Sequence, residues 1–197
     1  MKINQRVRTL AIGLSLALAT VALVPMAAAG SMGSMKMDKT VMVGGAAMYP
    51  SKNIIENAVN SKDHTTLVAA VKAAGLVNTL SGKGPFTVFA PTNEAFAALP
   101  AGTVDNLLKP ENKATLGKIL TYHVVAGNVT SGELLKAIRK GGGKASIKTV
   151  EGNSLTFSKD AQGVAITDDK GNVAHVTIAN VKQSNGEIHV IDKVLMP

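Results

Sequence analysis

The sequence predicts an α+β fold, in which helices fill most of the first part of the domain and strands fill the last part. Apolar residues recur with a helical period in several segments between Asp63 and Ile138. From Ala145 onward, short alternating runs follow one another and are separated by turn residues. One strand-like run, Phe86 to Ala90, is inserted among the helices. Because helices and strands do not alternate, we expect an antiparallel sheet or sandwich with packed helices.

The first helix is expected to run from about Asp63 to Gly75. Leu67 and Val71 lie on one face of it, and Asp63 or Ser61 can cap its N-terminus. Gly75 stands where the helical pattern stops, as is common at a helix C-terminus.

The run Phe86–Ala90 is short, apolar and rich in residues that favour strands, so it predicts a buried strand that Pro91 ends. Thr92 can then cap a new helix, whose buried face includes Phe96. Further helices are predicted at Thr103 to Leu108, at Lys113 to Leu120, and from a cap at Ser131 to the glycines 141–143.

The last part of the chain predicts a series of short strands. They are expected at Ala145–Val150, Ser154–Ser158, Val164–Thr167, Val173–Ala179 and Glu187–Val190. Asp168 and Asp169 lie in a turn between two of them. His175 and His189 each lie in an alternating run, which places them on exposed or partly exposed strand faces.

Residues 1–29 have the pattern of a signal peptide. Lys2, Arg6 and Arg8 precede an apolar run from Leu10 to Val24, and Ala27–Ala29 supplies a cleavage site. The apolar run is shorter than a spanning helix requires, although an uncleaved anchor is the alternative. We therefore expect an exported protein that is periplasmic, surface-bound or secreted. Removal of the signal lowers the net charge from +8 to +5, because the signal holds three basic and no acidic residues.

Residues 30–48 are expected to be a flexible segment, and residues 49–197 a single domain. The segment is rich in Gly, Ser and Met and has no periodicity. Its methionines could offer thioether ligands to Cu(I), but no His or Cys lies among them, so a tail is the favoured interpretation.

The composition argues against an enzyme, a metal site and a bound cofactor. The chain has no Cys, and its four His residues do not form a paired metal-binding motif. It has no nucleophile elbow for a serine hydrolase. With four Phe, two Tyr and no Trp, it cannot build the stacking surface of a single-strand nucleic-acid binder. We expect no metal, no cofactor and no nucleic-acid partner.

Three segments together resemble the fasciclin (FAS1) domain family. Phe86–Phe96 is similar to the family's first block, Leu120–Val125 to its central Tyr-His block, and Asn185–Leu195 to its C-terminal block. The resemblance covers roughly Tyr49 to Pro197 and is strongest to exported, single-domain bacterial members. It implies a wedge-shaped β-sandwich with helices packed along it.

The resemblance also implies a non-enzymatic role in cell adhesion, through a protein or glycan partner at the cell surface or in the matrix. The residues assigned to partner binding are Tyr122, His123, Val124 and Val125. The residues assigned to a structural motif are Thr92, Asn93, Phe96 and His189. We expect His123 to form a hydrogen bond with a neighbouring group. We expect Tyr122 to bury its ring and to direct its hydroxyl to a hydrogen-bond partner.

An alternative function remains open at this point: a carrier of a small hydrophobic ligand, held in a groove between sheet and helices. We expect at most peripheral association with a membrane, and a monomer or a weak homo-oligomer.

Overall fold

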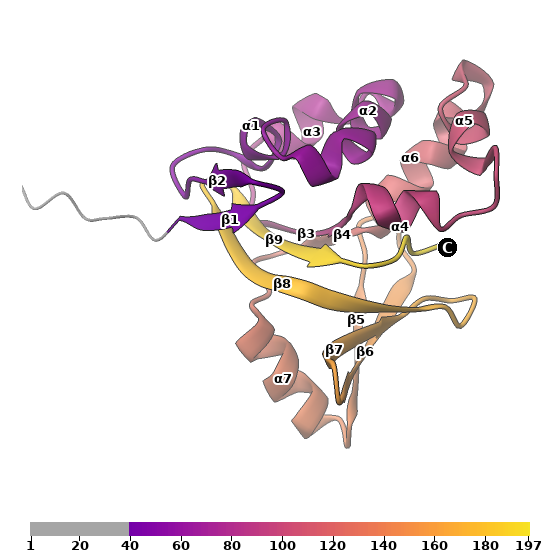
Figure 1. Cartoon of the computed structure of the whole chain (residues 1–197). Coiled ribbons are helices and arrows are strands. Elements are labelled where there is room, and N and C mark those ends of the chain that lie inside the picture. The colour runs from indigo at the N-terminus through magenta and orange to yellow at the C-terminus, as the bar shows by residue number, and fades with distance from the viewer. Residues whose placement is uncertain (1–39) are drawn as a thin grey trace, which may run out of the picture. The chain divides into compact units, whose positions relative to one another are not determined.

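A seven-stranded sheet forms the centre of the structure, a computed structural model that describes residues 40–197 (Figure 1). Its strands are β3 (Phe86–Pro91), β4 (Val124–Ala126), β5 (Lys144–Lys148), β6 (Ser154–Asp160), β7 (Gly163–Thr167), β8 (Val173–Gln183) and β9 (Gly186–Ile191). They lie in the order β4-β3-β9-β8-β7-β6-β5. All neighbours are antiparallel except β3 and β9, which are parallel. The predicted α+β class is confirmed.

All helices of the described residues precede the strands β5 to β9 in the chain, as predicted. They are α1 (Ile54–Ala58), η1 (Lys62–His64), α2 (Thr65–Ala74), α3 (Val77–Ser81), α4 (Asn93–Ala97), α5 (Thr103–Leu107), η2 (Pro110–Asn112), α6 (Lys113–Tyr122) and α7 (Ser131–Lys140). Gly75 ends α2 in the left-handed conformation, with a φ of 75°. The predicted cap of α7 is corrected by one residue: Thr130, and not Ser131, caps it in a capping box with Glu133.

Strand β8 bends the sheet, because its pairing with β9 is irregular between Val176 and Val181. The bend separates two apolar clusters. The first cluster lies between α1–α6 and the strands β3 and β9, and contains Leu67, Leu120 and Ile188. The second is shared by both halves of the sheet and by α7, in the manner of a sandwich. Figure 1 shows α7 on the opposite side of the sheet from α1–α3.

A hairpin of β1 (Val41–Val43) and β2 (Ala46–Met48) precedes α1. Val43 and Met48 are buried in the first cluster, so the prediction of a flexible segment is wrong for residues 41–48. The Gly44-Gly45 pair at the turn, with both φ angles positive, is a hairpin signal. The predicted signal peptide, residues 1–29, lies outside the described residues, as do residues 30–39.

Candidate functional site

The predicted partner-binding segment is a buried corner between α6 and β4. Tyr122, His123, Val124 and Val125 are between 0% and 4% exposed. Val124 belongs to the first apolar cluster and Val125 to the second, so the corner joins the two. A partner cannot reach these side chains in the folded domain. The assignment of the four residues to direct partner contact is therefore wrong, and their role is structural.

His123 is held by hydrogen bonds at both ring nitrogens. Its Nδ1 lies 2.8 Å from the Ile119 carbonyl oxygen, and the backbone N–H of Leu195 donates to its Nε2 at 3.0 Å. A carbonyl can only accept and an N–H can only donate, so the ring is neutral with its proton on Nδ1. Burial lowers the pKa of His123 to about 4. The predicted hydrogen-bonding role is confirmed, and it ties α6 to the C-terminal segment.

Tyr122 buries its ring in the second cluster, and its hydroxyl oxygen accepts a 3.0 Å hydrogen bond from the backbone N–H of Asp169. Burial raises the pKa of Tyr122 to about 12. The sequence marked Asp168 only as a turn residue. Its buried carboxylate accepts hydrogen bonds from the backbone N–H groups of Lys170, Asn172 and Met196. The turn before β8 is therefore fastened to both the Tyr-His corner and the chain end.

Thr92 and Phe96 of the structural motif have the roles that the sequence predicts for them. The Thr92 side chain caps α4 by accepting from the backbone N–H of Ala95, and Phe96 packs in the first cluster. Asn93 joins α4 to η1 and to the first turn of α2. Its Oδ1 accepts from the backbone N–H of Thr66 at 3.0 Å, and its Nδ2 donates to the Lys62 carbonyl at 2.8 Å. These residues fix the packing of two helices.

Replacement of Asn93 by Ala is expected to lower the free energy of unfolding by about 1–3 kcal/mol, because two cross-links between distant segments are lost. Asn93→Asp is the matched control, since it keeps the acceptor for Thr66 but loses the donor to Lys62. Urea unfolding checks the prediction, and the Asp variant should lie between the wild type and the Ala variant. Equal stability of all three proteins would contradict the assigned role.

His189 is fully buried in the central strand β9, so the prediction of an exposed or partly exposed position is wrong. Its Nδ1 accepts from the backbone N–H of Asn180 at 3.3 Å, and its Nε2 lies 2.8 Å from the Val129 carbonyl. The ring also stacks on Phe89, with centroids 5.5 Å apart. Its expected structural role follows from these contacts. The prediction for His175 is confirmed, since its side chain is 21% exposed.

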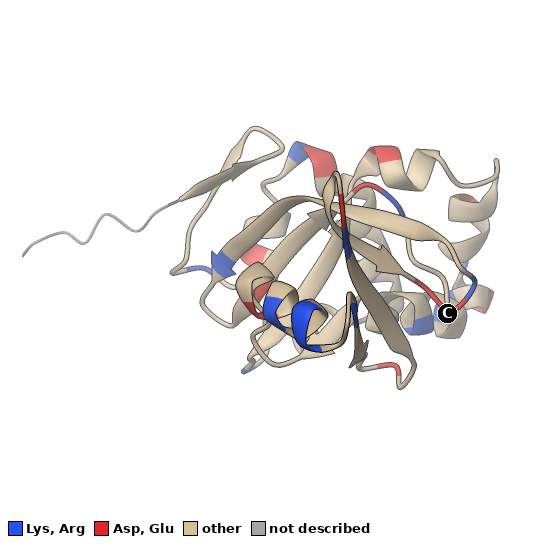
Figure 2. Cartoon of the chain, turned by 90° about the horizontal axis from the view of Figure 1, so that it is seen from below, with Lys and Arg blue, Asp and Glu red and all other residues tan. Residues whose placement is uncertain are grey.

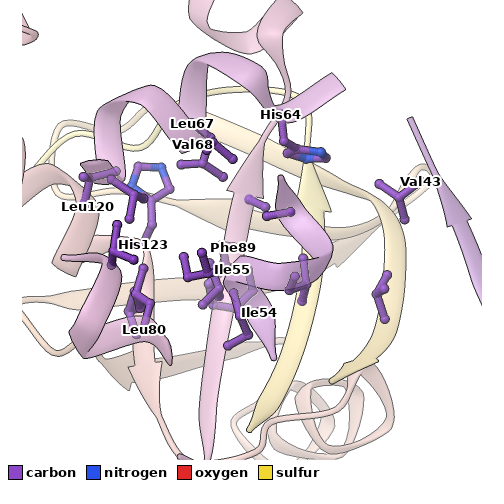
Figure 3. Close-up of a pocket in the computed structure, with 18 of the residues that line it drawn as sticks. Val43, Ile54, Ile55, His64, Leu67, Val68, Leu80, Phe89, Leu120 and His123 are labelled. Carbon is purple, nitrogen blue, oxygen red and sulfur yellow. The ribbon is translucent and has the colours of Figure 1, made fainter. Parts of the chain in front are cut away.

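An apolar pocket lies between the helices α1–α3 and the strands β3 and β9, within the first cluster. Figure 3 shows the imidazoles of His64 and His123 among its apolar side chains. His64 is buried, and its Nδ1 lies 2.9 Å from the Ser61 hydroxyl, while its Nε2 has no hydrogen-bond partner among the described residues. The cavity volume is ≈ 40 Å³. An apolar cavity that binds benzene measures about 150 Å³, so the pocket as it stands is too small for a lipid chain.

Within residues 40–197, no three His, Asp or Glu side chains gather in a way that could hold a metal ion. His175 comes nearest to such a cluster, with Asp160 at 2.9 Å and Asp192 at 3.4 Å on the surface. The helices of this part of the chain include none that is both long and apolar enough to cross a membrane.

The fold is that of a FAS1 domain. A FAS1 domain pair from the insect cell adhesion molecule fasciclin I superposes with a TM-score of 0.66 at 20% identity. The match covers 76% of this chain and 52% of that one. The family model of the fasciclin domain matches residues 62–197, and the chain belongs to this family.

Relatives in bacteria share much of the sequence. The protein sll1483 of Synechocystis is 49% identical over 81% of this chain and 82% of its own length. The cell surface glycolipoprotein MPB83 of Mycobacterium bovis is 35% identical over 79% of this chain and 64% of its own length. The resemblance stated from three sequence blocks is thus confirmed.

Proposed function

We propose that this protein is an exported, non-enzymatic adhesion domain, which binds a protein or glycan partner at the cell surface or in the matrix. Membership of the fasciclin family carries this proposal. It is supported by a relative named as a cell surface glycolipoprotein, and by the adhesion molecule whose fold this chain shares. The signal-like pattern of residues 1–29 supports export.

The burial of the Tyr-His corner favours a partner surface elsewhere on the domain. The corner instead holds α6, β4 and the C-terminal segment in place through His123. Substitution of Tyr122 or His123 is therefore expected to impair adhesion only by destabilising the domain. An interaction surface has to be sought among the exposed side chains.

The test is to express the full chain in its own host, purify the processed protein and measure its binding to intact cells and to envelope fractions. Deletion of the gene should reduce attachment of the cells to surfaces, and re-expression should restore it. If the purified protein binds no fraction and deletion leaves attachment unchanged, the proposal is wrong.

The alternative of a hydrophobic-ligand carrier has one observation in its favour, the apolar pocket that His64 lines. Its volume of ≈ 40 Å³ limits any occupant to a few heavy atoms unless the β1-β2 hairpin moves. Native mass spectrometry of protein purified from its host distinguishes the two functions, because a carrier retains a bound molecule and an adhesion domain does not.

A further inference from the structure

The positive charge of the domain is concentrated in one segment. Residues 40–197 contain sixteen Lys and Arg and twelve Asp and Glu. Ser131–Lys148, which comprises α7, three glycines and β5, holds five of the basic residues and one acidic residue, Glu133. Outside this segment the described residues carry eleven of each kind, so their net charge is zero. The excess charge of the domain therefore belongs to α7 and β5.

The basic side chains of this segment, together with that of Lys159 in β6, lie around the edge of the domain that α7 and β5 form, and we call this set the α7 basic face. Its members are all exposed: Lys136, Arg139, Lys140, Lys144, Lys148 and Lys159. Figure 2, seen from the α7 side, shows the basic bands on this helix. Between residues 40 and 197 the ion pairs found within 4.0 Å all involve His175, so none of these six cations pairs with an acidic side chain of the described residues at that distance. Glu133 is held at the other end of α7 by Thr130.

A hollow of ≈ 490 Å³ lies at the C-terminal end of α7, between Arg139 and Lys159. Leu135, Ile138, Gly142 and Gly143 complete its lining. The size falls in the range of ligand sites, which are about 300–1,000 Å³. The Nε–H of Arg139 donates to the Leu135 carbonyl at 3.3 Å, which anchors the guanidinium beside the hollow. Two cations thus flank a concave surface at the end of the helix.

The basic residues continue around the edge of the sheet, along strand β5. Ala145 and Ile147 pack against the second cluster, to which Leu134 and Ile138 of α7 also belong, so the alternate residues Lys144, Ser146 and Lys148 lie on the outer surface of the sheet, away from α7. Their partners on β6 carry only hydroxyl side chains: Ser158, Thr156 and Ser154. Lys144 and Lys148 are separated by about 13 Å along the strand. Two cations therefore flank a row of groups that can donate and accept hydrogen bonds.

Local roles explain part of this pattern. Basic residues at a helix C-terminus interact favourably with the helix dipole, and lysines on an edge strand oppose strand-to-strand aggregation. These two effects explain why a basic residue stands at each of the positions Arg139, Lys140, Lys144 and Lys148, when each position is considered separately. They do not account for Lys159 across the hollow, or for the concentration of the whole excess charge at one edge of the domain.

We propose that the α7 basic face binds an anionic polysaccharide, with the hollow between Arg139 and Lys159 taking one acidic sugar. This inference rests on the proposed function and names the partner class. Charges spread along the end of a helix and a strand match a polymer with repeated negative charges. Hydroxyl side chains between them suit the hydroxyls of a sugar chain. A membrane is less well matched, since the apolar residues Leu134 and Ile138 of α7 are buried in the core.

The test compares binding of alginate, a carboxylated polysaccharide, with binding of uncharged dextran. The patch variant is the triple substitution Arg139→Gln, Lys144→Gln and Lys159→Gln in the full chain. The matched control is Lys109→Gln, Lys113→Gln and Lys118→Gln, which removes the same charge from exposed positions before and within α6. Circular dichroism and thermal unfolding check that both variants fold.

We expect the wild type and the control to bind alginate and not dextran, with weaker binding in about 0.5 M salt than in about 0.05 M salt. The patch variant should bind alginate about tenfold or more weakly. Equal losses in both variants, or none in the patch variant, would overturn the inference. Tighter binding to phosphatidylglycerol vesicles or to polyglutamate than to alginate would also overturn it, in favour of a lipid surface or an acidic protein.

The two proposals fail in different ways. If the patch variant binds envelope fractions as well as the wild type does, the adhesion function stands and the polysaccharide inference falls. If the wild type binds alginate but no envelope fraction, and deletion of the gene leaves attachment unchanged, the inference about the α7 basic face stands and the adhesion function falls.

Discussion

Between pH 6.5 and pH 4, the free energy of unfolding is expected to fall by about 3 kcal/mol through His123 alone. The pKa of this buried imidazole is lowered to about 4 in the folded domain, from 6.5 for the exposed side chain. In this window the unfolded chain takes up a proton at His123 and the folded domain does not. Stability is complete above pH 6.5, decreases as the pH falls through the window, and levels off below pH 4.

Three other groups contribute to the same pH profile. Burial also lowers the pKa of His64 and of His189, and both therefore add to the loss of stability in acid. Burial raises the pKa of Glu187, which has the opposite sign, because its protonated form is favoured in the fold. Asp168 lies near His123 and favours its charged form, but burial has the larger effect.

Denaturant unfolding at a series of pH values measures the effect, and the variant His123→Phe removes it. This variant is less stable at neutral pH, because the N–H of Leu195 and the carbonyl of Ile119 lose their partner. Its pH dependence should be weaker by about 1.4 kcal/mol per pH unit within the window. An unchanged slope would contradict the assignment.

A measurement on the wild type does not depend on the variant folding. Nitrogen-15 chemical shifts of the histidine rings report which nitrogen carries a proton. His123 should remain neutral with its proton on Nδ1 down to about pH 4. Titration of His123 near its ordinary pKa of 6.5 would refute the geometry of the corner.

The elements that could be predicted from the sequence are those that local chemistry determines. Gly75 ends α2, Thr92 caps α4, and Asp168 forms a turn, because each acts on backbone groups within a few residues. The sequence singles out the Tyr-His corner as a segment of interest, but it does not predict that the side chains of this corner are buried. Two apolar clusters cover Val124 and Val125 from opposite sides, and this depends on contacts made by distant parts of the chain.

His189 shows the limit of the alternation argument most clearly. Alternating residues mark a strand with one face in water, whereas β9 lies between β3 and β8 with both faces covered. The parallel pairing of β3 with β9 joins segments about a hundred residues apart, so nothing near His189 in sequence indicates Phe89 as its neighbour. Similarly, the lysines of the α7 basic face are visible in the sequence, but the approach of Lys159 to Arg139 is not.

Replacement of Phe89 by Ala is expected to lower the free energy of unfolding by about 3–5 kcal/mol. Phe89 is fully buried in the sheet, where its ring stacks on His189 and lies 5.3 Å from the ring of Phe157. Its removal leaves a cavity between β3 and β6, on the two halves of the bent sheet, which the backbone cannot close without breaking strand pairs. Phe89→Leu keeps much of the volume and should cost less than half as much.

A double-mutant cycle tests whether Phe89 acts through Phe157. Each residue is replaced by Leu, singly and together, so that all four proteins remain folded, and the stabilities are compared by urea unfolding. The two substitutions should couple by about 0.5–1.5 kcal/mol, because an aromatic pair contributes beyond the area that it buries. Additive effects would mean that the two halves of the sheet are joined by apolar burial alone. Coupling would instead identify the Phe89–Phe157 contact as a specific link across the bend at β8.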